Sequence, residues 1–219
     1  MKFIGHLDVM RYFQKVMRRA EVDIAYSEGF SPHQIMSFAA PLGVGLTSTG
    51  EYLDIEVHST SSSDEMVRKM NETMVDGIEV LSYRLLPDNS KNAMSVVAAA
   101  DYEVNFREGY KPDINIKEEF KKFVNRETIE IIKKTKKSET LTDIRPLIYD
   151  AYVLDNDSIF MKLATGSADN LKPDLVIRAF CENMGIELNE FALEIKRLEL
   201  YGISDDRLVS LAEFGEKIE

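Results

Sequence analysis

Tryptophan is absent from the 219-residue chain, which also has a single cysteine and only three histidines. One cysteine, Cys181, excludes an intrachain disulfide and any metal or iron–sulfur site made only of cysteines within one chain. No apolar run approaches the roughly 20 residues that a membrane-spanning helix needs. His6, Asp8 and Arg11 interrupt the segment where a signal peptide would carry its apolar core. We therefore expect a cytoplasmic protein.

Basic residues are the minority among the charged side chains, because 27 Lys and Arg stand against 38 Asp and Glu, for a net charge of -11. This balance argues against a broad nucleic-acid-binding surface, which needs clustered Lys and Arg, but it leaves room for a local basic face. The hydrophobic content of 44% is enough for a real core, in which Phe, Tyr and Met supply the large side chains. The length suits one large domain or two small ones.

The first half of the chain has the apolar spacing of alternating strands and helices. It predicts helices at 7–20 and from Asp64, and strands at 2–4, 23–27, 35–39, 51–57 and 78–85. The intervening segment 28–50 is rich in glycine and proline, which is typical of loops. This half is interpreted as β-α-β-β-α-β.

A second series of predicted strands and helices follows the turn sequence PDNSKN at 87–92. Helices are predicted at 116–124 and 173–184, and strands at 100–107, 128–134, 144–154, 158–164 and 190–200, with a hairpin turn at 154–157 and a polar tail from Ser204. The order is again β-α-β-β-α-β with an extra strand. The sequence therefore predicts an α+β protein of two tandem ferredoxin-like domains with antiparallel sheets, residues 1–90 and 96–219.

The sequence GHLD places His6 and Asp8 where a strand turns into a helix. The exposed N–H groups of a helix start attract anions, and histidine titrates near neutral pH, so the motif is a candidate binding or acid–base site. The alternative is that both side chains only complete the first turn. Arg11 and Arg18 share one helical face with Lys15, which suits either a phosphate or carboxylate ligand or a plain solvated surface.

The sequence GFSPH, residues 29–33, predicts a rigid loop that presents Phe30, Ser31 and His33. Gly29 permits positive φ and Pro32 fixes a turn. Ser31 and His33 lack the context of a hydrolase nucleophile and base. A metal site on both motif histidines would need Asp8, Asp54 or Glu56 as a third ligand, and the spacing matches no known metal motif, so we expect no metal.

A second loop candidate combines Gly166, Ser167, Asn170 and Lys172 just before a predicted helix. It suits either an anion-binding loop or a plain connection from strand to helix. The glycine-rich segment 41–50 has neither the lysine of a P-loop nor a dinucleotide fingerprint, and is interpreted as a flexible loop.

The runs FIGHLDVMRYFQKVMRRA and YSEGFSPHQIMSFAAPLGVGLTSTGEYLDIE resemble a bacterial family of unknown function, the radical-SAM-linked proteins of the DUF2344 type. The family pattern is F-x-GHLD-x-x-R, RRA, GF-x-PH-x-x-x-SFA-x-PL-x-x-G and GEY-x-D-x-E. The resemblance implies a partner, because such proteins are encoded beside, or fused to, radical S-adenosylmethionine (SAM) proteins. Similar proteins begin several residues earlier, so we expect a short first strand here.

We expect an accessory or substrate-presenting module that works with a radical SAM enzyme and is not an independent enzyme. It would have no cofactor of its own and would use a polar pocket formed by the N-terminal motifs. The alternative is an RNA-binding or RNA-modifying protein, and a third reading, a hydrolase or metal-dependent enzyme, needs His6 and His33 to converge. The candidate binding residues are His6, Asp8, Arg11, Arg18, Phe30, Ser31, His33, Ser37 and Asp54.

Overall fold

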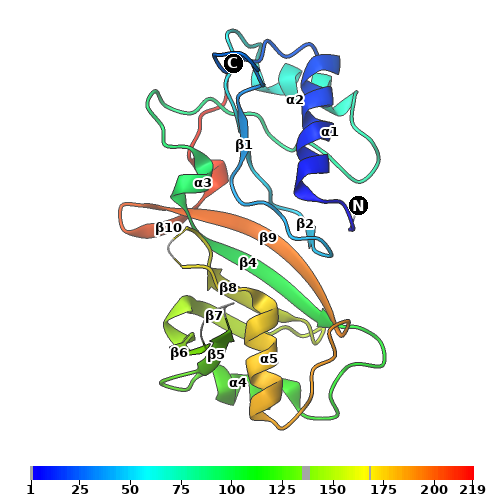
Figure 1. The fold of residues 1–219 in the computed structure, drawn as a ribbon, viewed down its shortest axis with the longest axis vertical. Coiled ribbons are helices and arrows are strands. Elements are labelled where there is room, and N and C mark those ends of the chain that lie inside the picture. Colours follow the sequence, from blue (N-terminus) through cyan, green and yellow to red (C-terminus); the bar gives the residue numbers. More distant parts are fainter. Residues whose placement is uncertain (1, 135–138, 168) are drawn as a thin grey trace. The chain divides into compact units, whose positions relative to one another are not determined.

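The computed structural model describes residues 2–134, 139–167 and 169–219, which divide into two compact units (Figure 1). Unit 1 comprises Met1–Gly45, Glu51–Val96 and Gly202–Glu219, and unit 2 comprises Leu46–Gly50 and Val97–Tyr201. The chain crosses from unit 1 into unit 2 between Val96 and Val97, next to residue 96, where the second domain was predicted to begin. The last 18 residues, which the prediction assigned to that domain, group with unit 1.

Unit 1 is built on two helices and a short antiparallel sheet. Its elements are α1 (His6–Arg19), β1 (Met36–Phe38), β3 (Leu53–Ile55), α2 (Ser63–Asn71), α3 (Ala93–Val96), β10 (Arg207–Ser210) and the 3-10 turn η2 (Leu211–Glu213). Val16 and Met17 of α1 pack with Met66 and Met70 of α2 in one buried cluster. Apolar residues three and four apart lie on one side of a helix, so both predicted helices bury one face here.

Two strands predicted for the first half do not form. Residues 2–4 and 78–84 have no strand pairing, and Leu85 makes a single bridge to Glu216. Val80 satisfies its backbone differently, because the side-chain amide of Asn71 donates to its carbonyl at 2.9 Å and accepts from its N–H at 2.8 Å. An alternating apolar pattern becomes a strand only where a neighbouring strand supplies these bonds. The strand expected at 23–27 is reduced to two single bridges, at Ile24 and Tyr26.

Unit 2 is a sheet with two helices on one face. Its elements are β2 (Thr47–Ser48), β4 (Val97–Phe106), α4 (Ile116–Val124), β5 (Glu130–Lys134), β6 (Glu139–Asp143), η1 (Arg145–Leu147), β7 (Ile148–Val153), β8 (Ile159–Ala164), α5 (Pro173–Asn183) and β9 (Leu193–Ser204, whose last three residues count with unit 1). The strand order is β10-β9-β4-β8-β7, with β2 parallel to β9 and the hairpin β5-β6 apart. Strand β8 is antiparallel to both β4 and β7.

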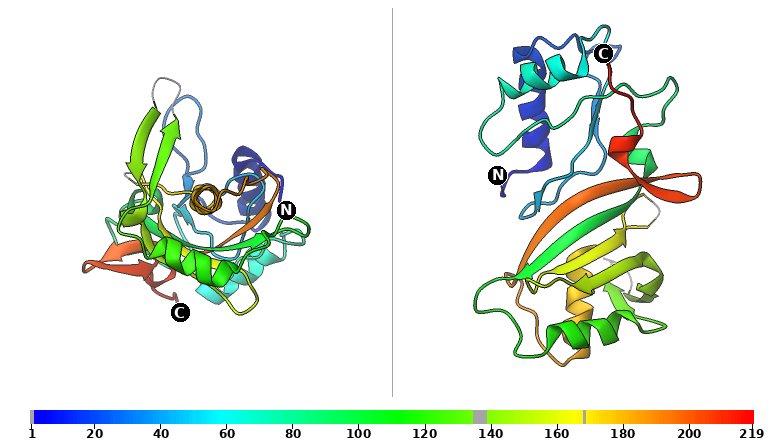
Figure 2. Two further views of the ribbon diagram at one scale, coloured as in Figure 1. Left: turned by 90° about the horizontal axis from the view of Figure 1, so that it is seen from below. Right: turned by 180° about the vertical axis from the view of Figure 1, so that it is seen from behind.

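The helices of unit 2 meet through aromatic rings. Phe180 of α5 lies 5.3 Å from Phe120 and 5.6 Å from Phe123 of α4, measured between ring centroids. Figure 2 shows both helices on the same side of the sheet. Ile159, Met161 and Leu163 of β8 are fully buried in this core. The coarser prediction, an α+β protein with antiparallel sheets, is confirmed.

The predicted turn at 154–157 joins β7 to β8, and Asp157 has a positive φ of 65° there. The single strand expected at 144–154 is interrupted, because Pro146 lies in the turn η1 and β7 begins only at Ile148. Strand β6 was not predicted. Within the described part of the chain, no helix combines the length and the apolar character needed to cross a membrane.

Candidate functional site

The GHLD motif forms the first turn of α1. Gly5 is the N-cap residue and makes no side-chain capping bond. The ring of His6 packs edge-on against Phe38 of β1, with ring centroids 5.7 Å apart. Asp8 pairs with Arg11 at 3.2 Å, and both side chains are mostly exposed. An exposed pair at this spacing contributes little to stability, so these two side chains remain accessible to a partner.

The GFSPH motif forms the tip of a hairpin spanning residues 26–34. Ser27 and His33 brace it with three bonds: Ser27 N–H to the His33 carbonyl (2.9 Å), His33 N–H to Ser27 Oγ (3.1 Å), and Ser27 Oγ with His33 Nδ1 (2.8 Å). Gly29 has φ 108°, a conformation that other residues rarely adopt. The brace holds the tip residues Phe30 and Ser31, both exposed, in a fixed loop.

The partner of His33 is Ser27, which the sequence analysis did not single out, and not Ser31. The sequence does contain a signal for this pairing, because Ser27 and His33 flank a short turn, and residues at the two ends of a turn face each other when it closes. The pairing uses the imidazole to fix the loop.

Ser37 and Asp54 lie opposite each other across β1 and β3, on the face away from His6. Adjacent residues of a strand point to opposite faces, and Phe38, which contacts His6, is the next residue along. Oδ2 of Asp54 accepts the backbone N–H of Ala93 at 2.6 Å, at the start of α3. Burial raises the pKa of the Asp54 carboxyl, against the opposing effect of this hydrogen bond.

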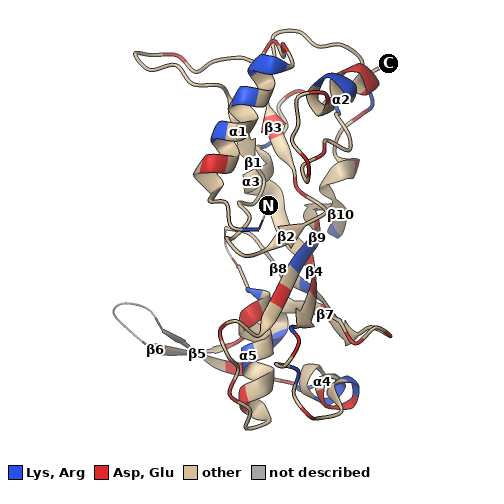
Figure 3. Cartoon of the chain, turned by 90° about the vertical axis from the view of Figure 1, so that its right-hand side faces the viewer, with Lys and Arg blue, Asp and Glu red and all other residues tan. Residues whose placement is uncertain are grey.

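The basic residues of α1 form a row on its exposed side. Figure 3 shows Lys and Arg along the helix beyond an acidic first turn. Lys15, Arg18 and Arg19 are exposed and form no ion pair with any described residue, whereas Arg11 is paired with Asp8. Because the positive charges of these side chains lie close together, they create a positive potential that attracts an anionic group.

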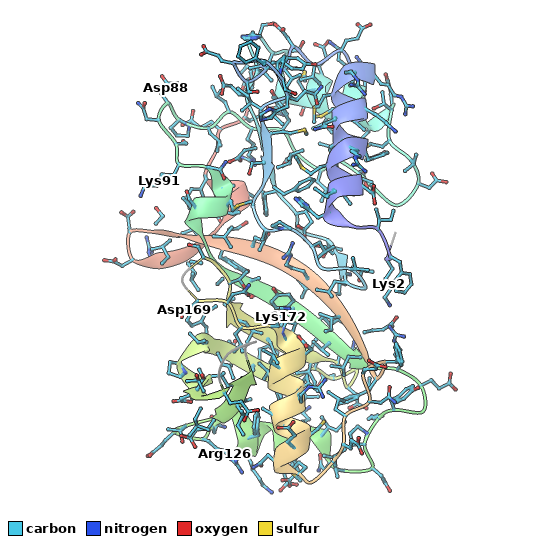
Figure 4. The ribbon with its side chains drawn as sticks, viewed as in Figure 1. Lys2, Asp88, Lys91, Arg126, Asp169 and Lys172 are labelled. Carbon is cyan, nitrogen blue, oxygen red and sulfur yellow. The ribbon has the colours of Figure 1, made fainter. Side chains whose placement is uncertain are left out.

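The second loop candidate is a tight connection between β8 and α5. A Cβ on Gly166 would stand 2.5 Å from the carbonyl oxygen of Val97, so only glycine fits beside that backbone. The loop is closed where Leu171 N–H bonds to the Ala164 carbonyl at 3.0 Å. Lys172 is exposed at the start of α5 (Figure 4), as are Ser167 and Asn170, while Ala168 lies outside the described residues.

A family model described as an uncharacterized protein conserved in bacteria (DUF2344) matches residues 1–173. The chain belongs to this DUF2344 family. The matched residues include α1, the braced hairpin, the β1-β3 sheet and the loop up to the first residue of α5. No curated protein is significantly similar to the chain.

Most of the predicted site residues of this DUF2344 protein lie in unit 1, on both ends of α1, in the hairpin and on the α3 side of the β1-β3 sheet. Gly166, Ser167, Asn170 and Lys172 lie in unit 2. No hydrogen bond joins His6 to His33 in the part of the chain that the structure describes. In that part, no three His, Cys, Asp or Glu side chains are placed to hold a metal ion. Burial raises the pKa of the Cys181 thiol to about 11, which disfavours a nucleophilic thiolate.

Proposed function

We propose that the protein is a binding module for a macromolecular partner and that this partner is a radical SAM enzyme, in the cytoplasm. The observation that carries the proposal is Phe30, which is fully exposed at the tip of a hairpin braced by Ser27 and His33. Exposing a large aromatic side chain gains nothing for folding, whereas a rigid, protruding aromatic residue is a typical anchor of a protein interface.

The start of α1 supplies a second group of exposed apolar side chains. Phe3 and Leu7 are 77% and 69% exposed, and Val44 is also exposed. Gly45 N–H bonds to the carbonyl of Lys2 at 2.8 Å, so the loop that carries Val44 lies beside this N-terminal segment. Apolar residues next to the Asp8–Arg11 pair have the composition of an interface centre with a polar rim.

The ferredoxin-like description is part of the proposal and is supported most directly in unit 2. Strands β4, β7, β8 and β9 and helices α4 and α5 follow one another as β-α-β-β-α-β, with the β5-β6 hairpin inserted. Unit 1 has the corresponding helices α1 and α2 but lacks the first and the last strand of that order. In this reading unit 2 is the scaffold, and unit 1 carries the contact surface.

The test is association of the purified chain with a radical SAM protein from the same organism, measured by biolayer interferometry. Phe30→Ala should weaken binding by about thirtyfold, the effect of losing an interface anchor worth about 2 kcal/mol. Phe191→Ala removes another exposed ring, in unit 2, and is the control, which should bind like the wild type. The proposal fails if the wild-type pair shows no association at micromolar concentrations.

RNA binding is the second candidate, favoured by the unpaired cations on α1. It predicts that Lys15→Glu combined with Arg18→Glu abolishes a mobility shift with single-stranded RNA, and that the wild-type affinity falls steeply as salt rises. If the wild type binds no RNA at low salt, this candidate is eliminated and the protein partner is unaffected.

A further inference from the structure

The sheet of unit 2 has a second face, opposite the helices α4 and α5. Tyr102 and Val104 of β4 point into the core, where they are 5% and 0% exposed. Successive residues of a strand alternate between the two faces, so Asp101 and Glu103 point the other way. The side chains on this face include charged and aromatic ones.

Strand register brings three of these side chains into one row. Glu103 of β4 lies opposite Phe160 of β8, and Phe160 lies opposite Tyr152 of β7. The Tyr152 and Phe160 rings pack with centroids 4.9 Å apart and planes inclined by 31°. Tyr152 is 45% exposed. We call these three residues the Tyr152 row.

The neighbouring row is charged and consists of Asp101, Lys162 and Asp150, again in register across the three strands. Lys162 is already engaged, because its Nζ lies 3.6 Å from Oδ1 of Asp101 and 4.1 Å from the centre of the Tyr201 ring. With Glu103, the two rows hold three carboxyl groups against one ammonium group. The area around the exposed aromatic rings is therefore suited to a cation.

We propose that the Tyr152 row, together with Asp150, binds an arginine side chain in a basic segment of a partner protein. A guanidinium group stacks on aromatic faces and directs its N–H donors to carboxylates. Glu103 is oriented for this, because Asn105 Nδ2 donates to its Oε1 at 3.3 Å and leaves Oε2 as an acceptor. Asp150 is exposed and lies two residues from Tyr152 on the same strand.

Charge distinguishes this occupant from a nucleic acid. Unpaired bases also stack on aromatic rings, but their phosphates require neighbouring Lys and Arg. Among the described residues, Arg145 lines a hollow together with Asp150. Its Nη1 donates to the Ile148 carbonyl at 2.8 Å, so this guanidinium group is engaged by the backbone.

The experiment is a titration of the full chain, with ¹³C-labelled tyrosine, by the blocked peptide Gly-Ser-Arg-Ser-Gly. Chemical shifts of the Tyr152 ring should move and saturate. The matched peptide with citrulline, which has the shape of arginine without its charge, should leave them unmoved. Glu103→Gln should lower the affinity for the arginine peptide about threefold or more, as expected for loss of one charged contact at an exposed site.

Variants of two neighbouring tyrosines complete the test. Tyr152→Leu removes the ring and should reduce affinity by a similar factor, monitored through the remaining tyrosine signals and by calorimetry. Tyr149→Leu, at an exposed tyrosine on the same strand, should bind like the wild type. Equal binding of both peptides, no shift at millimolar arginine peptide, or a Tyr152 shift with single-stranded RNA alone would overturn the proposal. Phe30→Ala should keep the response, which separates this site from the α1 and hairpin surface.

Discussion

Tyr201 donates its hydroxyl to Oδ2 of Asp101 at 2.7 Å, on the sheet face of unit 2 that also carries Lys162. Asp101 is only 7% exposed, and its Oδ1 has no hydrogen-bond partner among the described residues. Burial raises the pKa of the Asp101 carboxyl, although the Tyr201 hydrogen bond and the Lys162 charge both act to lower it. The free-energy cost of burying the charged carboxylate is greater than the stabilisation that Tyr201 and Lys162 give it.

This raised pKa gives a pH dependence of stability with a definite sign. The folded state binds the Asp101 proton more tightly than the unfolded state, in which aspartate titrates near about 3.9. The contribution of this group to stability is therefore fully present below that value and is lost as pH rises through the folded pKa. The free energy of unfolding of the wild type minus that of Asp101→Asn should fall as pH is raised from about 4.

Urea unfolding of both proteins over this pH range measures the difference directly. The raised pKa of Asp54 changes stability with pH in the same direction, but both proteins contain Asp54, so its effect cancels in the difference. A difference that stays flat, or grows with pH, would show that Asp101 does not titrate as described.

The bond between Asp54 and Ala93 makes a second prediction. Asp54→Ala leaves the Ala93 N–H without its acceptor at the start of α3 and should cost about 1–2 kcal/mol of stability. Asp54→Asn keeps an oxygen acceptor at the same place and should cost less. Chemical denaturation ranks the three proteins. Since Asp54 lies away from the proposed contact surface, Asp54→Asn should keep full affinity for the partner, and a selective loss of binding would restore Asp54 as a site residue.

The longer helices and the turn between β7 and β8 were the predictable part of this fold. Helix α4 was predicted with its observed bounds, because its apolar residues repeat at helical spacing and Asn115 caps it. The turn before β8 was predicted from LDND. The strands at 2–4 and 78–85 were not correct, since a strand depends on a partner that local sequence does not specify. Val80 instead bonds to the side chain of Asn71.

The site was less predictable than the fold for a related reason. The motifs correctly indicated a glycine-dependent rigid loop, but the contacts of its polar residues depend on the tertiary structure. Asp54 bonds to Ala93, 39 positions away in the sequence. Ser37 and Phe38 are adjacent in the sequence, yet they point to opposite faces of β1 and so cannot serve one pocket.

Cys181 provides a prediction about reactivity. The thiol is fully buried in α5 with a pKa raised to about 11, so thiolate is scarce at neutral pH and reagent cannot reach it. Native protein should resist iodoacetamide, and labelling should become complete only in denaturing urea, as measured by intact mass. Rapid native labelling would mean that α5 opens readily or that the thiol is activated.

Gly166 tests whether the loop between β8 and α5 is a structural connection. Gly166→Ala would force a Cβ to 2.5 Å from the Val97 carbonyl oxygen, and the two backbones would have to separate. We expect a loss of about 1–3 kcal/mol, the usual cost of overpacking a tight contact. Ser167→Ala and Lys172→Ala, at exposed positions in the same loop, should each stay within about 0.5 kcal/mol of the wild type in urea unfolding. If Gly166→Ala is as stable as the wild type, close packing is not why glycine is there. A phosphate-dependent rise in the melting temperature that Lys172→Ala removes would then favour the anion-binding alternative.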